Sequence, residues 1–242
     1  MVFYNHLIIF LTELRRSIRG LGIAIFLATL LLFLFAAPEL LRLLQNHLDE
    51  KLSFFSIPGP FLAHVKLAFF SALYLLMPWI MHVIWKGLGK PFGVVGRSLF
   101  WFVFCTCILF YAGTLFCYLV TLPFGVKFLL GFQSAQLKPV ISIGRFVNFI
   151  TIFILAFGLI FELPVFMIFS ARTGIVSRRT FEKNRRYAVL AIAILAALLT
   201  PTPDVVNMAL MGCPLYMLYE AGILIIRLLE IEGDREKGRD HA

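Results

Sequence analysis

The sequence predicts an all-α membrane protein with six membrane-spanning helices. Of its 242 residues, 61% are hydrophobic and only 14% are charged, whereas a soluble domain carries about 25% charged residues. The apolar runs are also longer than those of buried core helices, which polar faces interrupt. Composition and run length therefore both indicate a chain that crosses a membrane several times.

The uncharged runs divide the chain into six expected spans inside one polytopic membrane domain, residues 1–242. Short polar or basic segments separate them, and residues 230–242 form a polar tail. The expected spans are Gly20–Ala37, Phe61–Ile84, Ser98–Leu122, Phe146–Ser170, Tyr187–Thr200 and Val205–Leu229. The apolar part of the first span is longer than a typical signal-peptide core, so we expect it to stay uncleaved.

The distribution of lysine and arginine predicts the orientation of these spans. The N-terminal segment, the segments after spans two and four, and the tail together hold sixteen of these residues, against five in the opposite segments. Positively charged segments stay on the cytoplasmic side. Both termini are therefore expected in the cytoplasm. The net charge of +9 is explained by orientation and contact with anionic lipid rather than by nucleic-acid binding.

Spans five and six are expected to be short. Tyr187–Thr200 has 14 residues, which gives about 21 Å of helix, less than the hydrocarbon core of about 30 Å. Two prolines, Pro201 and Pro203, end it, and Pro214 and Glu220 interrupt span six. We expect neighbouring short spans to thin the bilayer on one side.

The motifs of enzymes and metal proteins are missing from the sequence. It contains no G-x-S-x-G, P-loop, H-E-x-x-H or C-x-x-C pattern, and its four cysteines all lie in apolar spans. We therefore predict a protein that is not an enzyme and uses no cofactor or metal.

Two acidic residues invite a functional interpretation. Glu13 lies just before span one, where it is either a surface partner of Arg16 or a docking carboxylate for a basic peptide. Glu162 lies inside span four, two residues before Pro164, which frees the carbonyl of Ile160. An acid at mid-span costs roughly 2.5–3.5 kcal/mol on insertion scales. It is either a structural hydrogen-bonding group or a polar group facing an intramembrane cavity.

Three further charged residues lie in or beside the spans. Asp204 follows Pro203 at the outer end of span five, where it caps the next helix, contacts a partner, or does both. Glu220 lies in span six, and Lys66 is the only basic residue near the start of span two. The sequence leaves open which acid Lys66 would pair with.

Taken alone, these residues leave two classes of function open besides protein transport. A proton-coupled small-molecule transporter would use Glu162 as its proton site, and a passive scaffold would use none of the charges. No internal repeat is present, although many alternating-access transporters are built from repeats.

Ordered motifs along nearly the whole chain resemble the TatC family, the receptor subunit of the twin-arginine protein translocase. The resemblance is strongest at Gly158–Val165, and it begins with Glu-Leu-Arg at 13–15. The other matching segments are Pro60-Phe61, Lys66-Leu67, Gly113 to Pro123, Gly174–Ser177, Arg185–Tyr187, Leu199–Asp204 and Pro214–Glu220.

The resemblance implies a multi-pass protein of the cell membrane, with six helices in a glove-shaped bundle. Both of its termini would lie in the cytoplasm. The resemblance also implies binding of twin-arginine signal peptides, TatA- and TatB-type single-span partners, self-association in a receptor complex, and export of folded proteins driven by the proton gradient. By the same resemblance, Glu13, Leu14 and Arg15 would bind the signal peptide. Glu162 and Pro164 would line the intramembrane cavity, and Pro203 and Asp204 would lie at the outer rim.

The sequence departs from the family pattern at two places. Phe10 stands where the N-terminal motif usually has a histidine. The first cytoplasmic loop, Gly93–Arg97, has no carboxylate, although the family usually places one there to help bind the two arginines. Glu13 would then do most of the recognition, a partner would supply the second acid, or binding would be weak. We favour the first.

Overall fold

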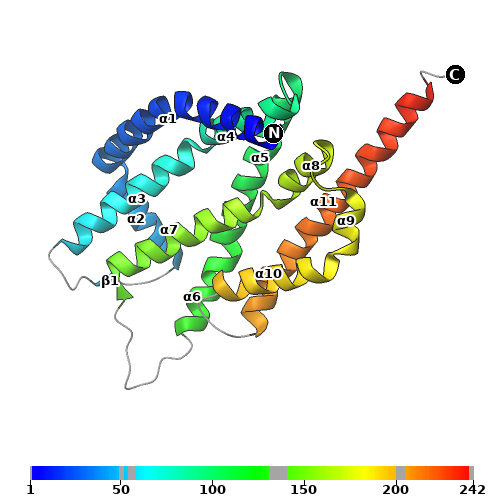
Figure 1. The fold of residues 1–242 in the computed structure, drawn as a ribbon. Coiled ribbons are helices and arrows are strands. Elements are labelled where there is room, and N and C mark those ends of the chain that lie inside the picture. Colours follow the sequence, from blue (N-terminus) through cyan, green and yellow to red (C-terminus); the bar gives the residue numbers. More distant parts are fainter. Residues whose placement is uncertain (1, 49–51, 54–57, 131–140, 200–204, 240–242) are drawn as a thin grey trace. The chain divides into compact units, whose positions relative to one another are not determined.

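The fold was analysed in a computed structural model, which describes residues 2–48, 52–53, 58–130, 141–199 and 205–239 (Figure 1). Within these ranges the chain is helical apart from short turns and two two-residue strands. The chain divides into two compact units, residues 1–156 and 157–242, and each unit is described by itself. The expected all-α class is confirmed.

The first unit begins with a long helix followed by a short amphipathic one. Helix α1 spans Val2–Phe35 and α2 spans Ala37–Leu48. Leu41 and Leu44 of α2 are buried, and Arg42 is exposed beside Glu39. This pattern is typical of a helix that lies in a membrane interface.

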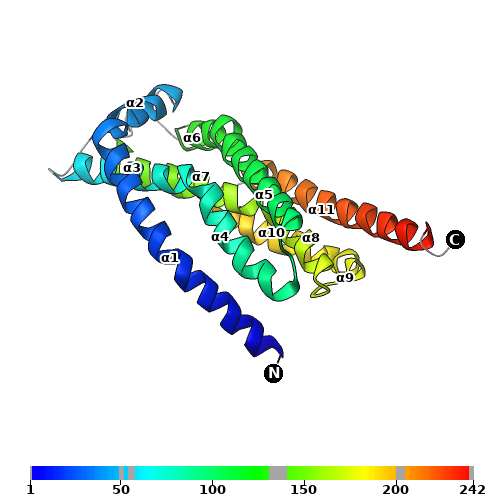
Figure 2. The ribbon, with the colours of Figure 1, turned by 90° about the horizontal axis from the view of Figure 1, so that it is seen from above.

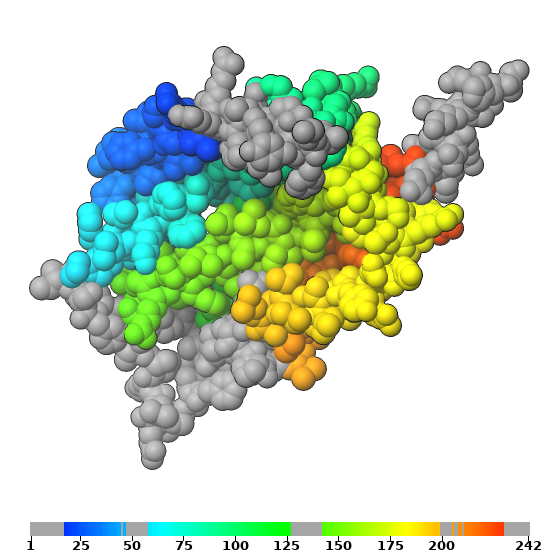
Figure 3. All heavy atoms as spheres, in the orientation of Figure 1, coloured from blue at the N-terminus to red at the C-terminus, as the bar shows by residue number. Residues whose placement is uncertain are grey.

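Helices α3 (Gly59–Leu75) and α4 (Met77–Gly89) form a bent pair. Their axes differ by 55°, because Pro78, the second residue of α4, cannot continue the hydrogen bonding of α3. Helix α1 packs along both (Figure 2). In the space-filling view α3 lies between α1 and the first part of α7 (Ile143–Ile160) (Figure 3).

Helix α5 (Arg97–Phe116) packs on α4 through aromatic rings and hydroxyl groups. The buried Trp85 ring stacks on Phe102 at 5.2 Å, and its Nε1–H donates to Thr106 Oγ1 at 2.8 Å. A 3₁₀ turn, η1 (Lys90–Phe92), joins α4 to α5. A π-helical segment, η2 (Cys117–Thr121), leads from α5 into α6 (Leu122–Leu130).

Two short strands complete the first unit. Strand β1 (Leu52–Ser53) pairs in parallel with β2 (Ile141–Ser142), in the register Leu52 with Ile141 and Ser53 with Ser142. The sequence analysis did not predict this pairing, because two-residue strands leave no alternating pattern.

The second unit contains α8 (Leu163–Arg172), α9 (Arg178–Lys183), α10 (Arg185–Leu199) and α11 (Val205–Arg239). Helix α11 packs against α8, α9 and α10. Its buried residues form a core with residues of α8 and α10; the members are Met167, Ile192, Leu215, Tyr219, Ile223 and Ile226. Pro214 lies inside α11 without ending it.

Four helical stretches in the described residues are long and apolar enough to cross a membrane. They are Ser17–Phe35, Arg97–Val126, Ile143–Arg172 and Met211–Leu229, and the bent α3–α4 pair makes a fifth. Each overlaps an expected span. Helix α10 has 15 residues, against the 14 expected for span five, and is shorter than a full span needs. The number of crossings, the orientation and the single domain over 1–242 stay predictions.

Candidate functional site

The helix break before α8 is the first candidate site, since it holds two of the predicted residues. Pro164 is the second residue of α8 and Glu162 precedes the helix. The Phe161 N–H donates to Phe157 O at 3.0 Å, and the Glu162 N–H donates to Leu159 O at 3.2 Å. The turn therefore tightens over Phe161 and Glu162, as expected where a proline prevents a continuous helix.

Glu162 is fully buried, with 0% of its surface exposed, and Pro164 is buried beside it in the sequence. The Glu162 backbone carbonyl accepts the N–H groups of Val165 and Phe166, at 3.0 and 3.1 Å. Its carboxylate does not cap α8. Burial of a carboxylate is costly. Because Glu162 is fully buried, water can reach it only if the packing around it opens. The role of Glu162 at a water-filled cavity stays a prediction.

Helix α11 approaches this break closely at Gly222. A Cβ atom there would lie 3.0 Å from Met167 Sδ and 3.4 Å from Pro164 Cα. Only a glycine lets the backbones of α8 and α11 come this near without displacing Met167. Small residues serve this purpose at helix contacts in membranes, where close packing replaces the hydrophobic effect.

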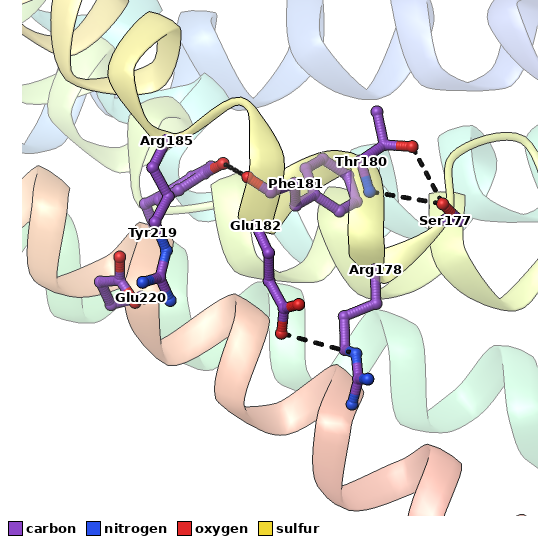
Figure 4. A network of polar contacts seen from close by, with 8 residues as sticks. All are labelled: Ser177, Arg178, Thr180, Phe181, Glu182, Arg185, Tyr219 and Glu220. Atoms are coloured by element: carbon purple, nitrogen blue, oxygen red, sulfur yellow. Dashed lines mark hydrogen bonds and ion pairs between the residues drawn. The ribbon is translucent and has the colours of Figure 1, made fainter.

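A polar network at the junction of α9, α10 and α11 is the second candidate site (Figure 4). Arg185 Nη2 donates to Glu220 Oε2 at 2.9 Å, and the Tyr216 hydroxyl donates to Glu220 Oε1 at 2.9 Å. The Tyr219 hydroxyl donates to the Phe181 carbonyl at 2.8 Å. Both oxygens of Glu220 are thus used, and α11 is tied to α9 and to the start of α10.

Helix α9 itself is fixed by local contacts in the same network. Ser177 precedes it in an extended conformation, and its Oγ accepts the Thr180 N–H at 3.4 Å. Arg178 Nε lies 3.5 Å from Glu182 Oε1, one helical turn away. Such a cap and an (i, i+4) ion pair stabilise a short helix.

The loop between α4 and α5 is shaped by three glycines. The Val94 N–H donates to Gly89 O at 2.9 Å, and a Cβ on Gly89 would lie only 2.6 Å from Val94 O. Gly93 and Gly96 have φ of 69° and 62°, which side chains disfavour. Helix α1 packs against η1, the turn that leads into this loop.

Several predicted site residues lie in parts of the chain where the structure describes only the backbone or nothing. Glu13, Leu14 and Arg15 belong to α1, of which only the backbone is described at that point. Pro203 and Asp204 lie outside the described residues. Their predicted roles are untested.

Lys66, which was expected to pair with an acid, binds an amide instead, and Glu220 binds an arginine. Lys66 Nζ donates to Asn148 Oδ1 at 3.3 Å, and Glu220 binds Arg185. Sequence reasoning missed Arg185, Tyr216 and Tyr219. Arg185, Tyr216 and Tyr219 were named only within matching family segments, and Arg185 also toward orientation. The four-residue spacing of Tyr216 and Glu220 was a signal that could have identified a pair.

Comparisons with known proteins support the family resemblance found in the sequence. A sequence profile of the Sec-independent protein translocase protein (TatC) matches residues 9–214. The TatC protein of Carboxydothermus hydrogenoformans is 34% identical over 242 residues, covering 98% of both chains. That of Koribacter versatilis is 33% identical over 204 residues, covering 83% of this chain and 74% of the relative.

Solved structures agree with these relatives. A crystal structure of the twin-arginine translocase receptor TatC, in the detergent DDM, superposes with a TM-score of 0.76 at 25% identity, covering 89% of this chain and 98% of that one. A second crystal structure of the same receptor gives 0.75 at 26% identity, covering 90% and 98%. The resemblance in the sequence is confirmed, and the chain belongs to the TatC family of Sec-independent protein translocase proteins.

Proposed function

We propose that this chain is the receptor subunit of a twin-arginine translocase in the cell membrane. It binds twin-arginine signal peptides and, with TatA- and TatB-type single-span partners, exports folded proteins using the proton gradient. The observation that carries the proposal is the extent of the matches. A TatC relative covers 98% of both chains, and a solved twin-arginine receptor is covered to 98%.

Complementation tests this function directly. Expressed in a bacterium that lacks its own TatC but keeps TatA and TatB, the chain should restore export of a folded reporter carrying a twin-arginine signal. Replacing both signal arginines by lysine should abolish that export. Export that is absent with the intact signal, or that survives the replacement, would contradict the proposal.

The signal-peptide site is assigned to the surface formed by α1 and the α4–α5 loop. Glu13, Leu14 and Arg15 lie on α1, which packs against η1. The loop residues Gly93–Arg97 have no carboxylate, so Glu13 supplies the acidic group. A carboxylate binds an arginine guanidinium through two parallel hydrogen bonds, which fits a signal with paired arginines.

A crosslinking experiment tests Glu13. Glu13→Gln removes the charge and keeps the side-chain size, and it should lower crosslinking of a twin-arginine signal peptide at least about tenfold, since a charge-assisted pair is worth about 1.5–3 kcal/mol. Glu39→Gln is the matched control, because Glu39 is an exposed acid paired with Arg42. Equal crosslinking by wild type and Glu13→Gln would eliminate Glu13 as the docking group.

Glu162 and Pro164 are proposed to line the intramembrane cavity, and Pro203 and Asp204 its outer rim. Glu162 is buried in the isolated chain, so we expect its surroundings to open when a signal peptide binds. In a variant without the native cysteines, Glu162→Cys should react with a water-soluble thiol reagent from one side, and more strongly with bound signal peptide. Protection in both states would assign Glu162 a structural role.

Both termini are assigned to the cytoplasm, following the asymmetry of lysine and arginine. A protease added outside right-side-out spheroplasts should leave a tag after Ala242 intact, and should remove it only after the membrane is permeabilised. Affinity purification through this tag should recover TatA- and TatB-type partners and further copies of the chain. Removal of the tag in intact spheroplasts would overturn the assigned orientation.

A further inference from the structure

The first unit contains a pocket of about 500 Å³ between its helices. Residues of α1, α2, α3, α5, η2 and α7 line it, all of them before residue 156. Helix α3 contributes one face, with Leu67, Phe70, Ser71, Tyr74 and Leu75 at the spacing of successive helical turns. The volume lies within the range of pockets that hold small ligands.

Three of the hydroxyl groups in this pocket have hydrogen-bond partners within the protein. The Tyr74 hydroxyl and Thr114 Oγ1 are 3.0 Å apart, and Thr114 Oγ1 also donates to Tyr111 O at 2.9 Å. Thr151 Oγ1 donates to Val147 O at 2.6 Å. Most of the other lining residues are leucine and isoleucine, so the pocket is suited to hydrocarbon.

One end of the pocket is lined by α2, the helix with an interfacial pattern. Leu40, Leu43 and Leu44 of α2 line it, and α2 has the pattern of an interfacial helix, with Arg42 and Glu39 exposed. From α2 the pocket extends along the membrane-spanning helices. This is the path of an acyl chain that enters from the interface.

A cation lies one helical turn from the pocket-lining residues of α3. Lys66 is exposed and precedes Phe70 by four residues, while its partner Asn148 precedes Thr151 by three. Residues three or four apart lie on the same helix face, so the Lys66–Asn148 pair borders the pocket on the side toward the start of both helices. An ammonium group there is complementary to a lipid phosphate.

We propose that the pocket binds one acyl chain of an anionic phospholipid, whose phosphate contacts Lys66 and Asn148. The lipid belongs to the leaflet in which α2 lies. A peptide helix is a poorer occupant, since a helix with its side chains is about 10–12 Å wide. A single hydrocarbon chain needs far less width and fits the 500 Å³ available.

Photo-crosslinking of the full chain in vesicles tests this proposal. The probe is phosphatidylglycerol with a diazirine on one acyl chain, diluted in phosphatidylcholine, and mass spectrometry locates the labelled residues. We expect labels on residues 67–75 and 150–155. Ser71→Leu fills the pocket and should lower that labelling about tenfold, whereas Ser170→Leu, the same change on α8, should not.

A second variant keeps the test decisive if Ser71→Leu disturbs folding. Leu155→Phe enlarges a residue that lines the pocket from α7 and should lower labelling in the same way. Labelling that is spread evenly over lipid-facing residues such as Ile108, or that is unchanged in a folded pocket-filling variant, would overturn the proposal.

A separate experiment tests the contact between Lys66 and the lipid phosphate. Lys66→Gln should remove the preference for phosphatidylglycerol over a phosphatidylcholine probe with the same chain, while Lys90→Gln should leave the preference intact. Equal labelling by both probes in the wild-type chain would overturn the phosphate contact. Loss of labelling when an added signal peptide competes would assign the pocket to a peptide instead.

Discussion

The two units of this chain join their helices by different chemistry. In the first unit, neutral groups join α5 to α3 and α4: Trp85 donates to Thr106, and the Tyr111 hydroxyl donates to the Tyr74 carbonyl at 3.0 Å. The Lys66 ammonium of α3 meets a neutral amide on α7, Asn148. In the second unit, an ion pair between Arg185 and Glu220 joins α10 to α11, and a glycine lets α11 approach α8.

Both solutions answer the same physical problem. Helices in lipid gain nothing from burying apolar surface against each other, so close packing and hydrogen bonds must hold them together. Neutral hydroxyl and indole groups tolerate the apolar interior of a bilayer, whereas an ion pair is least costly near the headgroups. We therefore expect the ion pair of the second unit to lie nearer the headgroups than the Trp85–Thr106 bond of the first.

The two helix breaks, one in each unit, also differ in the polar groups that they contain. Pro78 and Pro164 are each the second residue of the helix after the break. The carbonyl four residues before Pro78 belongs to Tyr74, and the Tyr111 hydroxyl satisfies it. The break before Pro164 instead contains a fully buried carboxylate. A proline alone is enough to break the helix. The residues around it decide whether the break is closed by a neutral hydrogen bond or holds an ionisable side chain.

The largest effect is expected at the turn between α4 and α5. Gly89→Ala would place Cβ 2.6 Å from the Val94 carbonyl oxygen, and backbone cannot yield as a flexible side chain does. We expect a loss of about 2–3 kcal/mol in unfolding free energy, measured by denaturation in detergent. Gly22→Ala, with nothing within 4 Å, is the control and should not destabilise, since alanine favours a helix over glycine. Equal stability of both variants would show that the backbone of this turn shifts to make room for the added Cβ atom.

A smaller effect is expected where α11 meets α8 in the second unit. Gly222→Ala would bring Cβ to 3.0 Å from Met167 Sδ, and a methionine side chain can adjust. We expect destabilisation by about 1 kcal/mol. Gly212→Ala on the same helix meets Ile192 Cγ2 at 4.0 Å, and should stabilise by up to about 1 kcal/mol through helix propensity. Two changes of the same sign would refute the close approach.

The hydroxyl contact of the first unit is expected to be weaker still. Tyr111→Phe keeps the ring against Tyr74, where the centroids are 5.0 Å apart, and removes only the bond to the Tyr74 carbonyl. We expect a loss of about 0.6–1 kcal/mol in unfolding free energy, typical of such bonds in membranes. A loss above that of Gly222→Ala would reverse the expected order.

The ion pair of the second unit should give the smallest effect. Arg185 and Glu220 have half and one third of their side-chain surfaces exposed, so solvent screens their attraction. A double-mutant cycle with Arg185→Gln and Glu220→Gln should yield a coupling energy of about 0.5–1 kcal/mol, falling as salt is raised. A coupling energy that ignores salt would indicate a pair shielded from water, and would remove the contrast with the first unit.

Much of the fold followed from residue patterns. The expected apolar spans overlap α1, the α3–α4 pair, α5, the α7–α8 pair, α10 and α11, because run length and proline act locally along the chain. The 55° bend at Leu76 was not predicted, although Pro78 marked its position. A proline breaks a helix, but the angle depends on what packs around it.

The sequence by itself determined the all-α membrane class, the short α10 and the break at Glu162, since each depends on hydropathy or on a missing backbone N–H group. Only the tertiary structure decided that Glu220 pairs with Arg185, that Lys66 binds Asn148, and that Glu162 is fully buried. The paired residues lie 35 and 82 positions apart. Contacts at such distances depend on how whole helices pack, which no local pattern of residues records.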